Sequence, residues 1–478
     1  MSIFQNYIDG QWISSSNAIK NINPSDTRDI VGDYAAAEKK QVDDAIAAAT
    51  SASDAWGKGS VQQRFDCLDF IGSEILARKE ELGRFLAQEE GKTLPEAIGE
   101  VARAGQIFKY FAGESLRVQG DYVASVRPGV EVEVSREALG VIGVITPWNF
   151  PIAIPAWKIA PALAYGNTVV FKPAELVPGS AWALSEIISR SGLPEGVFNL
   201  VMGTGQDVGQ LLLDDKRIDA VSFTGSVGTG AVVAAGCSGR GAKFQLEMGG
   251  KNPLVVLEDA DIDNAVACAL NGAFFSTGQR CTASSRLIID EKVHDRFVES
   301  LQSKVEGLRV GNALAETTQI GPVVDQRQLD QNMKYIDIGK SEGAELVCGG
   351  GLIEGETPGF YMAPALFVDT KNDMRINQEE IFGPVATTLK VSGLEEAIAV
   401  ANDTSFGLSA GVCTKSLSSS TEFKRKSQAG MVMVNLPTAG VDYHVPFGGT
   451  KGSSVGSREQ GRYAAEFYTT VKTTYIGA

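Results

Sequence analysis

The class of fold follows from residues 141–171, VIGVITPWNFPIAIPAWKIAPALAYGNTVVF. Residues 141–145 and 167–171 are short apolar runs rich in valine, which is typical of parallel strands buried on both faces. Residues 154–164 between them favour a helix. Because a strand, a helix and a second strand follow one another at this spacing, the segment predicts a βαβ unit.

The same alternation continues towards the C-terminus and predicts an α/β protein with doubly wound parallel sheets. A Gly/Pro-rich break at residues 249–253 predicts the boundary between two lobes. Residues 123–134 are valine-rich, with Pro128-Gly129 at the centre, and predict a projecting hairpin. Further strands are expected at 198–201, 220–223, 254–257, 286–289, 365–368, 386–389 and 431–434, and helices at 181–191, 209–213, 262–275 and 293–308.

Composition excludes several classes of protein. The chain has 478 residues, of which 44% are hydrophobic, and a net charge of −15. An acidic protein of this kind is not expected to bind nucleic acid or an anionic membrane. The chain has no run of about 18 apolar residues, so no membrane-spanning segment is expected. The first residues lack both a basic and an apolar leader segment, so a cytoplasmic protein is expected.

The counts of histidine and cysteine restrict the possible chemistry. There are two histidines, His294 and His444, and six cysteines, with neither a C-x-x-C pair nor an H-E-x-x-H motif. No metal site is therefore expected, and scattered single cysteines indicate a reducing compartment. An enzyme with so few histidines is expected to use a carboxylate or a lysine as its base.

Three side chains are candidates for catalysis. Cys281 follows Arg280 in a glycine-containing stretch between a helix and a strand, where it could act as a nucleophile. Glu247 lies in an apolar, glycine-rich setting that would raise its pKa towards that of a general base. Asn149 could donate to an oxyanion. The alternatives are an inert core cysteine, a salt-bridged surface glutamate and an asparagine that caps its own turn.

Other segments are candidates for binding a dinucleotide. Glycine-rich loops at 203–209 and 224–230 follow predicted strands, so backbone N–H groups there could approach a pyrophosphate. Lys172 and Glu175 follow the strand that ends at Phe171, where an acidic group could bind a ribose diol. Ordinary glycine turns and a solvated charged turn are the alternatives.

Together these segments resemble the aldehyde dehydrogenase family over essentially the whole chain. No single motif is specific, but their combination is. The matching motifs are Pro147-Trp148-Asn149-Phe150-Pro151, Glu247-Met248-Gly249-Gly250-Lys251-Asn252-Pro253, Gly278-Gln279-Arg280-Cys281, Glu379-Glu380-Ile381-Phe382-Gly383-Pro384 and Pro446-Phe447-Gly448-Gly449.

The resemblance implies a Rossmann-type coenzyme domain, an α/β catalytic domain and a small β arm for oligomerisation. Residues 1–118 and 140–249 are expected to form the coenzyme domain and residues 250–449 the catalytic domain. Residues 119–139 and 450–478 are expected to form the arm and tail. The arm and the strand-like residues 467–471 suggest a homodimer or homotetramer built by strand exchange.

The resemblance also implies the reaction. The Cys281 thiolate attacks an aldehyde, Asn149 and the Cys281 N–H stabilise the oxyanion, and Glu247 activates the water that hydrolyses the thioester. NAD is the expected coenzyme because Glu175 would repel a 2′-phosphate, and NADP is the alternative. The coenzyme residues implied by position are Ile145, Thr146, Trp148, Lys172, Glu175, Gly205, Phe223, Gly225, Ser226, Gly230, Glu380 and Phe382.

The substrate is implied less specifically. Within the family the sequence is most similar to dehydrogenases of α-ketoglutaric semialdehyde, whose substrate carboxylate needs a cationic or amide-rich partner; Arg280, Arg286 or His444 could supply it. The alternative for Arg280 is that it points away from the site and holds the structure. The alternatives are succinic semialdehyde, betaine aldehyde or a hydrophobic aldehyde, and, from another class, a binding relative without catalysis. The residues expected to line the substrate tunnel are Ala153, Ile154, Trp157, Arg280, Thr282, Val441, His444 and Phe447.

Overall fold

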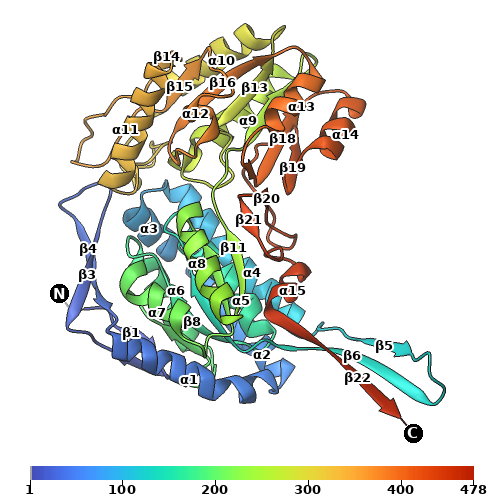
Figure 1. Ribbon diagram of the computed structural model, residues 1–478. Coiled ribbons are helices and arrows are strands. Elements are labelled where there is room, and N and C mark those ends of the chain that lie inside the picture. Colours follow the sequence, from blue (N-terminus) through green and yellow to red (C-terminus); the bar gives the residue numbers. More distant parts are fainter. Residues whose placement is uncertain (1–2, 478) are drawn as a thin grey trace.

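The computed structural model describes residues 3–477 and consists of two α/β lobes and a projecting β arm (Figure 1). This confirms the predicted α/β class and its parallel sheets. Within residues 3–477, no helix is both long and apolar enough to cross a membrane.

The first lobe contains an eight-stranded sheet with the order β2-β1-β9-β8-β7-β10-β11-β21. The five strands from β9 to β11 are parallel, and antiparallel strands close both edges. The strands are β1 (Asn6–Ile8), β2 (Gln11–Ile13), β7 (Val141–Ile145), β8 (Thr168–Lys172), β9 (Phe198–Leu200), β10 (Ala220–Thr224), β11 (Lys243–Glu247) and β21 (Ser454–Val455).

Helices cover both faces of this sheet, as its uniformly apolar strands predict. Because alternate residues of a strand face opposite sides, Ile142 and Val144 of β7 join one core while Val141 and Ile145 join the other. The first core includes α2 (Val61–Ala77), α3 (Lys79–Glu90), α4 (Leu94–Ser115), α5 (Ala153–Ala164), α6 (Pro178–Ser189) and α15 (Ala465–Tyr468), and the second α1 (Lys39–Gly57), α7 (Gln210–Asp214) and α8 (Val227–Arg240).

The second lobe contains a seven-stranded sheet with the order β14-β15-β16-β13-β12-β18-β19, parallel except for β14. Helices again pack on both faces. The strands are β12 (Pro253–Val256), β13 (Arg286–Asp290), β14 (Glu345–Cys348), β15 (Ala365–Val368), β16 (Val385–Val391), β18 (Ser409–Cys413) and β19 (Met431–Val434). The helices are α9 (Ile262–Phe274), α10 (His294–Glu306), α11 (Gln326–Ser341), α12 (Arg375–Gln378), α13 (Leu394–Asn402) and α14 (Leu417–Lys426).

Three strands form the arm that extends from the first lobe (Figure 1). The long strand β6 (Val130–Ala138) pairs with β5 (Asp121–Ala124) on one side and with β22 (Thr469–Gly477) on the other. The remaining small elements are β3 (Asn17–Ile22), β4 (Ile30–Ala36), β17 (Phe406–Gly407), β20 (Thr450–Lys451), the π-helical turn η1 (Gly205–Gly209) and the 3₁₀ turns η2 (Phe275–Gly278) and η3 (Arg462–Ala464).

The structure adds detail to two of the sequence predictions. The glycine-rich residues 205–209 form the π-helical turn that leads into α7, so the predicted helix at 209–213 has an irregular start. The first residues of the predicted tail are built into the lobes, since β20 pairs with β17 and β21 pairs with β11. The tail therefore connects the two lobes before it reaches the arm (Figure 1).

Candidate active site

The site lies where the order of the parallel strands in the first lobe reverses, so that successive strands are added on opposite sides of β7. From β7, the chain continues to β8 on one side, while β10 pairs with β7 on the other. Ligands of α/β proteins bind outside the carboxyl ends of the strands at such a switch point. The loop that follows β7 carries Trp148 and Asn149, and the turn that follows β10 carries Gly225 and Ser226.

Two cavities meet at Cys281. One has a volume of about 220 Å³ and adjoins the switch point. The other has a volume of about 330 Å³ and adjoins α4 and α5. Since Cys281 lies on the wall of both, its thiol can face a ligand from each side.

The predicted residues divide between these cavities. The cavity at the switch point is lined by Trp148, Asn149, Ile154, Gly225, Ser226, Glu380 and Phe382, with Trp148 and Phe382 in edge-on contact at 5.4 Å between ring centroids. The other cavity is lined by residues predicted for the substrate tunnel and is called the substrate-side cavity below; these residues are Ala153, Trp157, Arg280, Thr282, Val441 and Phe447. Ile154, predicted for the substrate tunnel, lines the switch-point cavity.

The loop that carries Cys281 has an unusual backbone. Ser276 and Thr277 have φ of 51° and 56°, and Gly278 has φ of 65°. A side chain at Gly278 would lie 2.2 Å from the carbonyl oxygen of Gly383. Only glycine fits this position, and the left-handed residues before it are a strained arrangement typical of functional loops.

The protein environment disfavours a Cys281 thiolate. Burial raises the pKa of the thiol to about 12, and the negative charges of Glu380 and Glu247 act in the same direction. The backbone N–H groups of Cys281 and Thr282 oppose this effect. Because only the thiolate is a nucleophile, the thiol needs a base or a nearby positive charge to react at neutral pH.

Glu247 has the properties of a general base. It is the last residue of β11 and is buried, and the hydroxyl of Ser454 donates to its Oε2 at 2.6 Å. Its Oε1 has no hydrogen-bond partner among residues 3–477. Burial, followed by the charge of Glu459, raises its pKa well above that of an ordinary glutamate. A carboxylate whose pKa is raised in this way is a stronger base than an ordinary glutamate and can take a proton from water.

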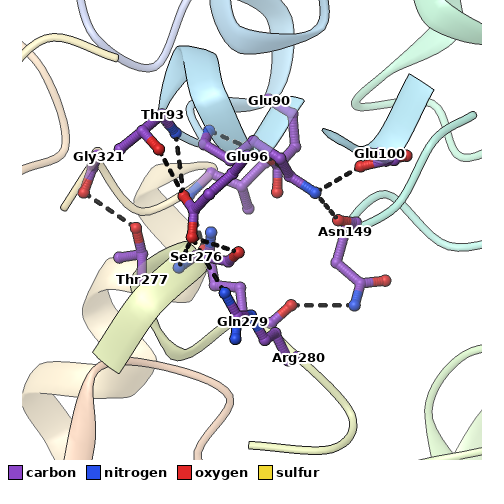
Figure 2. Close-up of polar contacts among 12 residues, drawn as sticks. Glu90, Thr93, Glu96, Glu100, Asn149, Ser276, Thr277, Gln279, Arg280 and Gly321 are labelled. Atoms are coloured by element: carbon purple, nitrogen blue, oxygen red, sulfur yellow. Dashed lines mark hydrogen bonds and ion pairs between the residues drawn. The ribbon is translucent and has the colours of Figure 1, made fainter. Parts of the chain in front are cut away.

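Asn149 is fixed on both sides (Figure 2). Its side-chain Nδ2 donates to the backbone carbonyl of Gln279 at 3.0 Å, and its backbone carbonyl accepts from Lys92 Nζ at 2.7 Å. Lys92 is buried and pairs with Glu100 at 2.6 Å. Glu100 also accepts from the backbone N–H groups of Ile152 and Ala153, where α5 begins. Among residues 3–477, the second N–H of Asn149 has no partner and is free for an oxyanion.

Glu380 lies over the glycines that follow β11. The Gly250 N–H donates to Glu380 Oε1 at 2.8 Å, and a side chain on Gly249 would lie 2.0 Å from Oε2. Burial raises the pKa of Glu380 to about 7. The glycines thus allow this carboxylate to reach the wall of the switch-point cavity.

The residues at the switch point fit a dinucleotide. The hydroxyls of Thr146 and Thr224, after β7 and at the end of β10, are buried and have no partner among the described residues. Ser226 caps α8 by accepting from Thr229 N–H at 3.3 Å, and the first turn of this helix is exposed. Unpartnered donors and an open helix N-terminus suit a ribose and a pyrophosphate.

Several predicted residues do not line either cavity. Lys172 Nζ lies 3.4 Å from Glu175 Oε2, and burial lowers the pKa of Lys172. Gly205 is exposed at the start of η1, and Gly230 packs against Met248. His444 is exposed outside the substrate-side cavity. Ile145, Thr146, Phe223 and Glu247 are buried behind the cavity walls.

The sequence alone did not indicate the charged side chains of α4 and of the turn before it. Lys92, Glu96, Glu100 and Arg103 all line the substrate-side cavity, together with Asn271. Their spacing of three to four residues was the available signal, because it places them on one face of a helix. On the other side, Gln328 and Gln331 of α11 line the switch-point cavity.

A comparison with known proteins decides the family. A protein-family model described as "Aldehyde dehydrogenase family" matches residues 12–474 of this chain. The chain belongs to the aldehyde dehydrogenase family. The resemblance found in its motifs is confirmed, and with it the prediction that the protein is an enzyme that oxidises an aldehyde with a nicotinamide coenzyme.

Named relatives cover nearly the whole of this aldehyde dehydrogenase. The chain is 43% identical to the alpha-ketoglutaric semialdehyde dehydrogenase of Bacillus subtilis, over 99% of this chain and 98% of that protein. It is 42% identical to the alpha-ketoglutarate semialdehyde dehydrogenase of Haloferax volcanii, over 98% of each.

Solved structures agree in fold. The NAD-dependent aldehyde dehydrogenase of Sinorhizobium meliloti has a TM-score of 0.97 at 35% identity, covering 100% of this chain and 95% of that one. The betaine aldehyde dehydrogenase of Staphylococcus aureus, solved in complex with NAD+, has a TM-score of 0.96 at 33% identity, covering 99% and 95%. NAD is the coenzyme named for both of these proteins.

Proposed function

We propose that this aldehyde dehydrogenase oxidises α-ketoglutaric semialdehyde to α-ketoglutarate with NAD. Support comes from three relatives at 43%, 42% and 39% identity over at least 98% of the chain, all named for this substrate. The observation that carries the mechanism is the position of Cys281 at the junction of two cavities, one suited to a dinucleotide and one to an aldehyde.

Cys281, Asn149 and Glu247 perform the chemistry in this proposal. The Cys281 thiolate attacks the aldehyde carbon, and the free N–H of Asn149 together with the Cys281 N–H stabilises the resulting oxyanion. A bound NAD would supply the acceptor for the hydride that this carbon loses. Glu247 then takes a proton from water, whose oxygen attacks the thioester and breaks the carbon–sulfur bond, so that the acid and the Cys281 thiolate are released.

The coenzyme is assigned to the switch-point cavity and its surroundings. Gly225, Ser226 and Gly230 would hold the pyrophosphate at the start of α8, and Lys172 and Glu175 the adenosine ribose. Glu175 favours NAD over NADP because its carboxylate repels a 2′-phosphate. The remaining residues assigned to coenzyme binding are Ile145, Thr146, Trp148, Gly205, Phe223, Glu380 and Phe382.

Betaine aldehyde is the second candidate substrate, because relatives named for it are 37–39% identical to this chain. Betaine aldehyde carries a quaternary ammonium group, whereas the substrate-side cavity has three cationic side chains, Lys92, Arg103 and Arg280. Two carboxylates, Glu96 and Glu100, share that wall. The surplus of positive charge favours a carboxylated aldehyde.

The proposal extends to the whole protein. The β arm would join subunits into a homodimer or homotetramer. The six cysteines form no disulfide within the described residues, which favours a cytoplasmic location. Residues 1–118 and 140–249 would bind the coenzyme, 250–449 would carry the catalytic cysteine, and 119–139 with 450–478 would form the arm and tail.

Steady-state kinetics with NAD test the proposed substrate. We expect kcat/KM for α-ketoglutaric semialdehyde to exceed that for succinic semialdehyde, betaine aldehyde and benzaldehyde. Cys281→Ala should lose activity with every aldehyde while it still binds NAD. Substantial turnover by Cys281→Ala would contradict the mechanism, and a preference for betaine aldehyde would contradict only the substrate.

A further inference from the structure

The substrate-side cavity has three cationic side chains on its wall, and two of them already have anionic partners. Lys92 pairs with Glu100 and also donates to the carbonyl of Asn149. Arg280 pairs with Glu96, with Nη2 and Oε1 3.0 Å apart. These contacts hold the loops of the active site together and leave neither cation free for a ligand.

Arg103, on α4, is the third cation, and no acidic side chain neutralises it. Within residues 3–477, no carboxylate oxygen lies within 4.0 Å of its guanidinium group. Its Nη2 donates to the side chain of Gln460 at 3.2 Å, while its buried Nε has no partner in the described part of the chain. A guanidinium group has five N–H donors, so most of those of Arg103 are unused.

The acidic groups near Arg103 are engaged elsewhere or exposed. Glu100 is held by Lys92 and by two backbone N–H groups of α5. Asp442, whose charge also acts on Arg103, is exposed to solvent, where its effect is screened. The positive charge of Arg103 therefore stays available to a ligand in the cavity.

Aromatic side chains surround this charge. The guanidinium carbon of Arg103 lies 5.7 Å from the centroid of the Trp157 ring, which is stacked on Phe447 at 5.4 Å. The indole Nε1 of Trp157 is also buried without a partner. Buried donors without a partner are rare in folded proteins, and two of them here belong to residues that line one cavity.

We propose that Arg103 binds the carboxylate at the far end of the aldehyde substrate and thereby selects carboxylated aldehydes. The proposal rests on the assignment of this cavity to the aldehyde. An arginine fork matches the two oxygens of a carboxylate, while the apolar walls suit the carbon chain between the carboxylate and Cys281.

None of the three anchors expected from the sequence is in this position. Arg280 is paired with Glu96. Arg286 is buried in β13, where it donates to Asn372 and to the carbonyl of Val400, and it does not line the cavity. His444 is exposed outside it. Arg103 takes their place because the sequence could not show which cations would already have partners.

Substitution of Arg103 tests the proposal with two substrates of similar length. For Arg103→Gln, kcat/KM with α-ketoglutaric semialdehyde should fall about 10- to 100-fold, mainly through KM, because charge-assisted hydrogen bonds are lost. The value for pentanal, which has no carboxylate, should change less than about threefold. Arg103→Lys should recover part of the loss, since lysine keeps the charge but not the fork.

Lys109→Gln is the matched control, because Lys109 lies on the same helix, pairs with Asp69 at the surface and lines neither cavity. It should behave as wild type with both aldehydes. Unchanged thermal unfolding of Arg103→Gln would show that its fold is intact. An equal loss with both aldehydes, or no loss with the carboxylated one, would overturn the proposal.

Inhibition by glutarate separates this proposal from the substrate assignment. If the wild-type enzyme prefers pentanal, the proposed substrate is wrong, but glutarate should still inhibit pentanal oxidation. Arg103→Gln should then raise its inhibition constant at least tenfold. Glutarate that fails to inhibit the wild type, or that inhibits both proteins equally, would show that Arg103 is not a carboxylate anchor.

Discussion

Burial disfavours the charged forms of three acidic groups in the site, Cys281, Glu247 and Glu380. The pKa of Cys281 is raised to about 12 and that of Glu380 to about 7, and Glu247 shifts in the same direction. The reactive thiolate should therefore be scarce in the free enzyme at neutral pH.

Replacing Glu380 by glutamine should make Cys281 more acidic. Above pH 7 the Glu380 carboxylate is charged and raises the pKa of the thiol, so its removal lowers that pKa. The rate of Cys281 alkylation by iodoacetamide at pH 9, followed by mass spectrometry, should increase about two- to tenfold. The neighbouring Glu379, which pairs with Arg375, is the control, and Glu379→Gln should leave the rate unchanged. A slower reaction in Glu380→Gln would contradict this assignment.

At the scale of elements, the site is made of loops held by helices. The loop after β7 is fixed to α4 through Lys92 and to the nucleophile loop through Gln279. The sequence predicted β7, α5 and β8 well, because continuous apolar runs and prolines mark them locally. It did not predict the contact of Lys92 with Asn149, since 57 residues separate the two along the chain.

Lys92→Met should destabilise the protein strongly. The variant leaves the Glu100 carboxylate buried without its cation, which costs about 3–5 kcal/mol of unfolding free energy. Urea unfolding would measure it, and the double variant with Glu100→Gln should recover part of the loss. Lys109→Met breaks an exposed ion pair with Asp69 and should cost less than about 1 kcal/mol. Equal costs for the two lysines would contradict the buried network.

At the scale of the molecule, the arm exposes apolar side chains and strand edges that an isolated subunit would leave in contact with water. It projects away from both lobes (Figure 1). Four apolar side chains on β5, on the turn after it and on β22 are all more than half exposed: Tyr122, Val126, Val471 and Tyr475. The outer edges of β5 and β22 have no neighbouring strand among residues 3–477. Exposed apolar residues and open strand edges are typical of a subunit interface.

Charged substitutions on the arm should therefore dissociate the oligomer. Light scattering of the wild type should give two or four times 50.7 kDa, and the variant with Val471→Asp and Tyr475→Asp should approach 50.7 kDa. Leu417→Asp on α14, which is exposed outside the arm, should not change the mass. A wild-type protein of 50.7 kDa would refute the role of the arm.

The sequence by itself determined the fold class, the family and the candidates Cys281, Glu247 and Asn149. These depend on local patterns, such as apolar runs, glycines and motifs, that need no knowledge of distant contacts. Only the tertiary structure showed that Cys281 lies between two cavities, that Arg280 is paired with Glu96, and that Arg103 is left without an anion. Whether a charge is free or neutralised depends on residues that folding brings from elsewhere in the chain, and for that reason the sequence alone could not show which cations already have partners.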